Sequence, residues 1–236
     1  RSNPIPTLEE IESSNSYSET HSMTMERFFE DVDFLVANGE TRDGQKLPRD
    51  LAEKYVVNSR VLELTDLRSR AATALYDIEL WNFEYTENGT SFIDRAHELY
   101  PRLTNEARIA PSTTIKGIDP GYAAFATNHF TGGQVRYIGY VYADMAAQMT
   151  AENLWDRFEK ETGRRTLFRQ PKLVEYLRDG YYRAGFKQAF PSPVEAFIDK
   201  PYLPEAVVSP MVKAVEKFVP AKVLPKCEAN LTQRKP

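Results

Sequence analysis

Residues 129–142 hold an unusual density of side chains that can donate protons or hydrogen bonds. The stretch begins with His129, continues through a glycine pair and ends with three spaced tyrosines. If the part after the glycines is helical, Tyr137, Tyr140 and Asp144 lie on one face. A row of phenols facing a cleft can donate hydrogen bonds to a developing oxyanion. Tyrosines on a helix also commonly complete an apolar core. The residues alone leave both interpretations open.

The other side chains that could do chemistry do not form a complete catalytic set. The only histidines are His21, His97 and His129, and a catalytic zinc usually needs three protein ligands. The nearest approach to a His-Glu-x-x-His zinc motif begins at His97, and its second histidine is missing. Cys227, in a proline-rich tail, has no nearby base that would make it a nucleophile. The sequence also lacks a glycine-rich phosphate-binding loop.

Composition excludes some classes of function. The chain has 236 residues, of which 30 are basic and 34 acidic, well mixed along the sequence, so nucleic acid is not expected as its main partner. No apolar run approaches the length of a membrane span. A single cysteine fits a reducing compartment. Because the first residue is Arg1 and not methionine, we expect a processed or trimmed form, or a fragment.

Periodicity predicts an all-α fold, mostly helical with at most a short strand or two. In the longest expected helix, one apolar face contains Leu67 and Leu75, and Asp77 lies off that face. Pro48 is suited to open a separate helix before the longest one. Pro101 is expected to stop one helix and Gly163 to end another. Besides the helix that follows residue 133, the expected helices span residues 19–36, 51–55, 61–81, 91–100, 151–162 and 172–184, with a last one opening at Pro210.

The same reading divides the chain into three parts. Residues 1–18 are expected to form an extended N-terminal arm, which is polar and contains two prolines. Residues 19–208 form the helical domain, and residues 209–236 form a C-terminal helix and an irregular tail. Arms without a core of their own are typical of subunits that bind neighbouring proteins.

Four stretches together resemble a known family. They are residues 19–28, which begin Glu-Thr-His-Ser-Met, residues 39–51, residues 74–80 (Ala-Leu-Tyr-Asp-Ile-Glu-Leu) and residues 129–140. In this order they resemble the C-terminal half of the thimet oligopeptidase and mitochondrial intermediate peptidase family of zinc metallopeptidases. The resemblance runs from about Glu19 to Val208 and implies the helical C-terminal subdomain of a zincin-like oligopeptidase.

The resemblance implies roles for four residues. Glu19 would be the third zinc ligand, and His129, Tyr137 and Tyr140 would bind substrate and stabilise the tetrahedral oxyanion. The chain departs from the family pattern at His21, Met23, Gly133 and Ile138, and its late glycine-rich segment is reduced to residues 184–186. The upstream helix that carries two zinc histidines and the general base is not in this sequence. We therefore expect no cofactor in this chain alone, and zinc only if a companion segment supplies two histidines.

Three functional hypotheses follow. The first is a non-catalytic, peptidase-derived structural subunit of a larger assembly, which contacts other subunits through its N- and C-terminal arms. The second is the C-terminal half of a working zinc metalloendopeptidase that cleaves oligopeptides or presequences. Its His-Glu-x-x-His helix would lie on another polypeptide or on a removed N-terminal part. The third is a peptide-binding module without hydrolysis. The resemblance favours the mitochondrial matrix over the cytoplasm as the location.

Overall fold

The residues that the structure describes are mostly helical, which confirms the all-α prediction. The computed structural model describes residues 15–82, 91–107, 136–183, 189–203, 205–209 and 212. Within these ranges it contains no strand, only an isolated antiparallel bridge between Glu40 and Lys46. The elements are α2 (Asn15–Glu26), the 3-10 turn η1 (Arg27–Glu30), α3 (Val32–Asn38), α4 (Arg49–Trp81), α5 (Phe92–Ala107), α8 (Ile138–Thr162), α9 (Leu173–Glu175), the π-helical turn η2 (Tyr176–Tyr181) and α10 (Ser192–Ile198).

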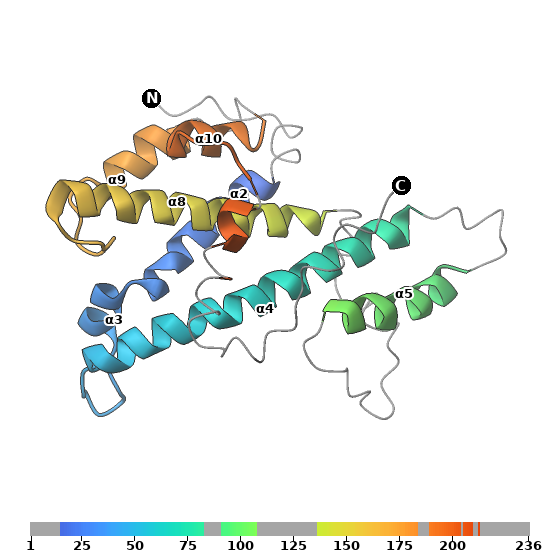
Figure 1. Ribbon diagram of the computed structural model, residues 1–236, viewed down its shortest axis with the longest axis horizontal. Helices are drawn as coiled ribbons and strands as arrows, with labels where there is room; N and C mark the ends of the chain where they lie inside the picture. Colours follow the sequence, from blue (N-terminus) through green and yellow to red (C-terminus); the bar gives the residue numbers. More distant parts are fainter. Residues whose placement is uncertain are drawn as a thin grey trace.

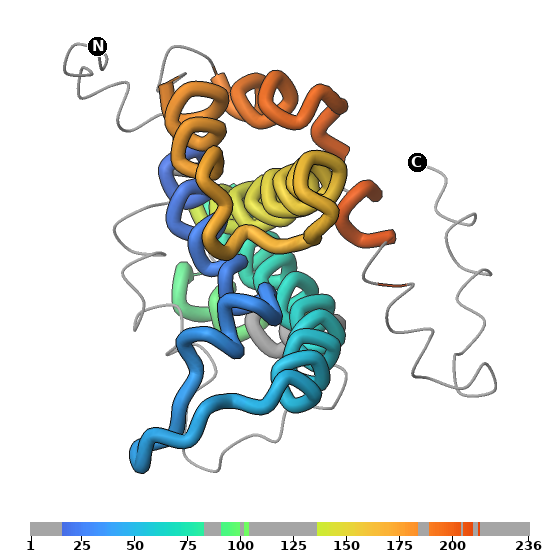
Figure 2. The backbone as a smooth tube through the Cα atoms, turned by 90° about the vertical axis from the view of Figure 1, so that its left-hand side faces the viewer, coloured from blue at the N-terminus to red at the C-terminus, as the bar shows by residue number. Residues whose placement is uncertain are grey.

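Helix α8 is the centre of the arrangement. Helix α2 packs along it, and the long α4 crosses below it, while α10 lies on its opposite side (Figures 1 and 2). Helix α5 lies beside the C-terminal half of α4 (Figure 1). The larger apolar core surrounds α8, where Leu154 and Phe158 meet Tyr181 and Phe197. A second cluster joins α4 to α5 through their buried aromatic and leucine side chains, namely Tyr76, Leu80, Leu99 and Leu103.

Helix α4 is one continuous helix of 33 residues, so the prediction of two helices divided before residue 61 was wrong. The stretch 56–60 contains no glycine or proline, and nothing in it interrupts the backbone hydrogen bonds. The buried face also differs from the expected stripe. Leu67 is buried as predicted, but Leu75 is 49% exposed and Asp77 is fully buried. The face that contacts α5 and α8 therefore includes a carboxylate, which a pattern of apolar residues cannot reveal.

The helix expected over residues 19–36 is divided at Asp31. Its backbone is extended (φ −99°, ψ 111°), and its carboxylate accepts hydrogen bonds from the N–H groups of Asp33 and Phe34. This is an N-cap, which starts α3 and separates it from η1. Helix α2 begins at Asn15, so the last four residues of the expected arm are helical, and residues 1–14 lie outside the described ranges.

Two further boundaries differ from the sequence prediction, and one agrees. Helix α5 continues through Pro101 to Ala107, because Leu99 and Leu103 bury their side chains on either side of the proline. The helix after residue 133 and the one expected over 151–162 form the single helix α8. It ends at Gly163, whose φ of 73° lies in the left-handed region, as predicted. The segment 213–236 lies outside the described ranges.

Candidate functional site

Tyr137 and Tyr140 lie together at the start of α8. Their ring centroids are 5.5 Å apart, and both side chains are half-buried. Tyr137 packs against both apolar clusters of the protein. Its backbone N–H donates to the carboxylate of Asp77 at 3.1 Å. A buried carboxylate from α4 thus accepts a hydrogen bond at the N-terminal end of α8, where the helix dipole favours negative charge. The position of Tyr137 joins α4, α5 and α8.

Glu19 lies on α2, which packs against the helix of the two tyrosines. Its side chain is half-buried and accepts a hydrogen bond from the Ser22 hydroxyl at 3.2 Å. Met23, one turn further along α2, packs with Ala143 and Tyr140. The structure therefore brings the helix of Glu19 against the helix of Tyr140. His129, the fourth residue of the expected site, lies outside the described ranges.

The described residues do not by themselves assemble a zinc site. Among them, no group of three or more His, Cys, Asp or Glu side chains is placed to hold a metal ion. His21 is only two positions from Glu19 and therefore points to a different side of α2. His97 is exposed on α5. The expectation that zinc would need two histidines from a companion segment therefore stays a prediction.

His21 instead belongs to an aromatic cage. Its ring lies 4.4 Å from the ring of Tyr17, 5.1 Å from that of Tyr181 and 4.3 Å from that of Tyr182. Burial lowers the pKa of His21 to about 4, so the imidazole is neutral at physiological pH. No local pattern predicts this cage, because its members come from both ends of the domain.

A buried ion cluster connects three elements. Arg27 of η1 forms ion pairs with Glu30, with Glu63 of α4 and with Asp144 of α8. We call these four residues the Arg27 cluster. Arg70 approaches the other oxygen of Asp144 at 3.5 Å. Burial opposes the charge of Arg27, but the three carboxylates outweigh it and raise the pKa of the guanidinium. Sequence analysis placed Asp144 on the tyrosine face and did not find its partner, which is 117 positions away.

The three carboxylates are not fully neutralised. Burial raises the pKa of Glu63, and the nearby charges of Glu30 and Asp144 add to this effect, against the opposing influence of Arg27. Glu30 pairs with Arg27 through Oε1, whereas its Oε2 is buried and accepts no hydrogen bond from the described residues. The three carboxylates of the cluster therefore carry more negative charge than Arg27 and the nearby Arg70 can balance.

A groove lies above this cluster, between α2–η1 and α4, and has a volume of about 490 Å³. We call it the α2–α4 groove. Its floor includes Arg27, Glu63 and Asp144. Large apolar side chains lie along its sides and remain exposed, namely Phe29 (56%), Tyr55 (50%) and Leu62 (62%). Such exposure on a concave surface with polar surroundings is typical of a protein interaction site.

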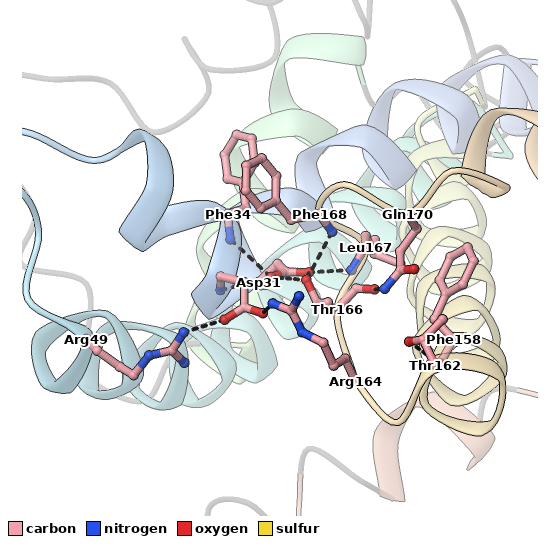
Figure 3. A network of polar contacts seen from close by, with 11 residues as sticks. Asp31, Phe34, Arg49, Phe158, Thr162, Arg164, Thr166, Leu167, Phe168 and Gln170 are labelled. Carbon is pink, nitrogen blue, oxygen red and sulfur yellow. Dashed lines mark hydrogen bonds and ion pairs between the residues drawn. The ribbon is translucent and has the colours of Figure 1, made fainter.

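A second polar network lies directly after η1, at Asp31. The Asp31 carboxylate accepts hydrogen bonds from the Thr166 hydroxyl at 2.8 Å and from the Leu167 N–H at 2.5 Å, besides the two that cap α3 (Figure 3). We call this set the Asp31 network. It connects α3 to the segment that follows α8. Every oxygen of this buried carboxylate has partners, which makes it a structural element rather than a reactive group.

Comparisons with known proteins do not assign the chain to a family. No protein-family model, no curated protein and no solved structure matches the chain. The resemblance to zinc oligopeptidases therefore stays a prediction. In the described part of the chain, no helix is both long enough and apolar enough to cross a membrane.

Proposed function

We propose that this protein is a non-catalytic, peptidase-derived structural subunit of a larger mitochondrial assembly. The observation that carries the proposal is the set of exposed apolar side chains, Phe29, Tyr55 and Leu62, along one concave surface. Moving a fully exposed leucine or phenylalanine side chain into a core is favourable by roughly 1.5–3 kcal/mol, and these side chains are about half exposed. A partner protein that covers them recovers part of this free energy.

The use of the polar residues agrees with this proposal. Tyr137 packs against both apolar clusters, and its N–H is bonded to a buried carboxylate. Arg27, the most buried basic group among the ion pairs of the described residues, is engaged by carboxylates from three elements. These groups serve to position the helices. The mitochondrial location rests on the resemblance to mitochondrial intermediate peptidase.

The proposal is tested on native material purified under mild conditions without chelators. We expect the chain to elute in a complex far larger than its own 27.0 kDa, with well under one zinc per copy and no hydrolysis of unfolded peptides. Native mass measurement and elemental mass spectrometry provide the two readouts. A native chain that elutes alone as a monomer would contradict the proposal.

A second candidate function is the C-terminal half of a zinc metalloendopeptidase. The observation in its favour is that Met23 packs the helix of Glu19 against Tyr140, so the helices of two residues of the expected site are in contact. In this case the native complex would contain about one zinc per copy. Glu19→Gln would remove the zinc and the activity, whereas the matched change Glu53→Gln, on the exposed surface of α4, would leave both unchanged. Zinc that survives Glu19→Gln would exclude Glu19 as its ligand.

A further inference from the structure

The two walls of the α2–α4 groove present apolar groups at helical spacing. On the α4 side, Tyr55, Ser59, Leu62 and Asp66 follow one another at steps of four, three and four positions, which places them on one face of the helix. On the opposite side, η1 contributes Phe29. Tyr55 and Leu62 on α4 and Phe29 on the opposite side thus flank a concave floor, which is a geometry that can accept the apolar face of an amphipathic helix.

The charge of the groove restricts what can enter it. Five carboxylates and two guanidinium groups line it, and both guanidinium groups are already in ion pairs with Asp144. Glu26 and Asp66 lie at the surface of the groove and form no ion pair with any described residue. An acidic segment or an anionic lipid surface would be repelled by this excess of negative charge.

The floor itself favours a cation. The unpartnered Oε2 of Glu30 is a buried acceptor, and leaving such a group without a partner is costly. The raised pKa of Glu63 reports the same excess of carboxylates over cations. A lysine or arginine side chain that enters the groove from a partner would place positive charge beside this excess of carboxylates.

We propose that the α2–α4 groove binds a basic amphipathic helix of a partner protein. Its apolar face contacts Phe29, Tyr55 and Leu62, and its lysine or arginine side chains pair with Glu26, Asp66 and the floor carboxylates. This inference rests on the proposed function as an assembly subunit. It goes further, because it names the contact surface and the chemistry of the partner.

The binding test uses the full chain and a fluorescent synthetic helix of about five turns, built from leucine and lysine with one apolar face. Two control peptides have the same leucines with glutamate in place of lysine, or the same composition in a scrambled order. Fluorescence anisotropy should show that the lysine helix binds at least about tenfold more tightly than either control. Binding should weaken at high salt, because exposed charges are screened. Equal binding of the scrambled peptide would overturn the proposal.

Variants locate the site on the protein. Leu62→Glu should weaken binding of the lysine helix about tenfold or more, whereas Val174→Glu, at the exposed surface of α9, should not change it. Glu26→Lys with Asp66→Lys should reverse the preference toward the glutamate helix. The matched pair Glu98→Lys with Glu175→Lys changes the net charge equally but lies outside the groove. If this control pair weakens binding as much, the attraction is non-specific and the inference is wrong. Circular dichroism checks that each variant is folded.

The assembly provides the independent arm of the test. Leu62→Glu introduced into the native chain should release it from its complex, while Val174→Glu should not. A variant that stays in the complex would overturn the groove assignment but leave the proposed function intact. A wild-type chain that is monomeric in its source would overturn the proposed function itself. Self-association of the pure chain that is lost in Leu62→Glu would assign the groove to a second copy and contradict the proposed partner.

Discussion

The Asp31 network and the Arg27 cluster are two buried polar sites that are neighbours in the sequence, and they are built differently. In the Asp31 network one carboxylate receives hydrogen bonds from two backbone N–H groups of α3, from Thr166 and from Leu167. In the Arg27 cluster three carboxylates share one buried guanidinium. The first site is fully satisfied within the chain. The second has more carboxylates than guanidinium groups and lies next to an open groove, so it is suited to binding as well as to folding.

The largest effect is expected from Arg27→Met. Loss of the guanidinium leaves Glu30, Glu63 and Asp144 buried without their common partner, which should lower the free energy of unfolding by about 3–5 kcal/mol. Urea denaturation monitored by circular dichroism measures it. The control is Lys54→Met, which removes the exposed ion pair to Asp50 and should cost under about 1 kcal/mol. A loss for Arg27→Met as small as that for the control would mean that the cluster does not hold the helices together.

Asp31→Ala should have the next largest effect. It removes the N-cap of α3, worth about 1 kcal/mol, and leaves the Thr166 hydroxyl and the Leu167 N–H without their acceptor. We expect a total loss of about 2–3 kcal/mol in the same denaturation experiment. Asn38→Ala, which removes an exposed hydrogen bond within α3, is the matched control and should change stability little. Similar losses in the two variants would show that Asp31 acts only as an ordinary surface cap.

Acidification should act mainly through His21. Because its pKa is lowered to about 4, its stabilising contribution is fully present above the unfolded value of 6.5 and is lost between 6.5 and about 4. Allowing for its partial exposure, the loss should be about 1–2 kcal/mol. Thermal melts from pH 7 to 4 should show that His21→Phe reduces this acid sensitivity, while His97→Gln, at an exposed position, does not. Parallel pH curves for wild type and His21→Phe would contradict the assignment.

The smallest effect, of opposite sign, is expected from Glu63→Gln. Since the pKa of Glu63 is raised, the folded protein favours the neutral form, whose shape glutamine imitates. Its contribution to stability is therefore greatest below the ordinary value of 4.5 and decreases as the pH rises through the higher folded pKa. At pH 7 the variant should be as stable as wild type or more stable by about 0.5 kcal/mol. Urea denaturation at several pH values measures this dependence. It should be done in the His21→Phe background, because the acid response of His21 would otherwise overlap with that of Glu63. If Glu63→Gln instead lowers the free energy of unfolding as much as Arg27→Met does, the prediction is wrong, and the ion pair with Arg27 fully compensates the charge of Glu63.

The sequence predicted the elements better than their ends or their polar contacts. The all-α class and the end of α8 at Gly163 were predictable, because both depend on local periodicity and on one glycine. The break at Asp31 was missed because apolar residues keep helical spacing on both sides of it. The continuation of α5 through Pro101 depends on packing against α4, which overrides local preference.

The candidate site was predictable only in part. Tyr137 and Tyr140 were identified by type and spacing, and Glu19 only by the resemblance. The structure places their helices in contact, and their roles stay a prediction. The Arg27 cluster was not identified, because Glu63 is 36 positions from Arg27 and Asp144 is 117 positions from it. Sequence distance of this size leaves no local pattern. The exposed apolar groups of α4 were likewise hidden, because a pattern of apolar residues does not tell which face is covered.

The unbroken length of α4 has a mechanical consequence. A helix of 33 residues is about 50 Å long, and its two halves have different neighbours. The first half forms a wall of the α2–α4 groove, whereas the second half packs against α5 (Figure 1). Bending such a rod at its middle would break backbone hydrogen bonds, so its ends keep a fixed separation. In an assembly, α4 would act as a rigid spacer that sets the distance between whatever contacts its first turns and whatever contacts α5.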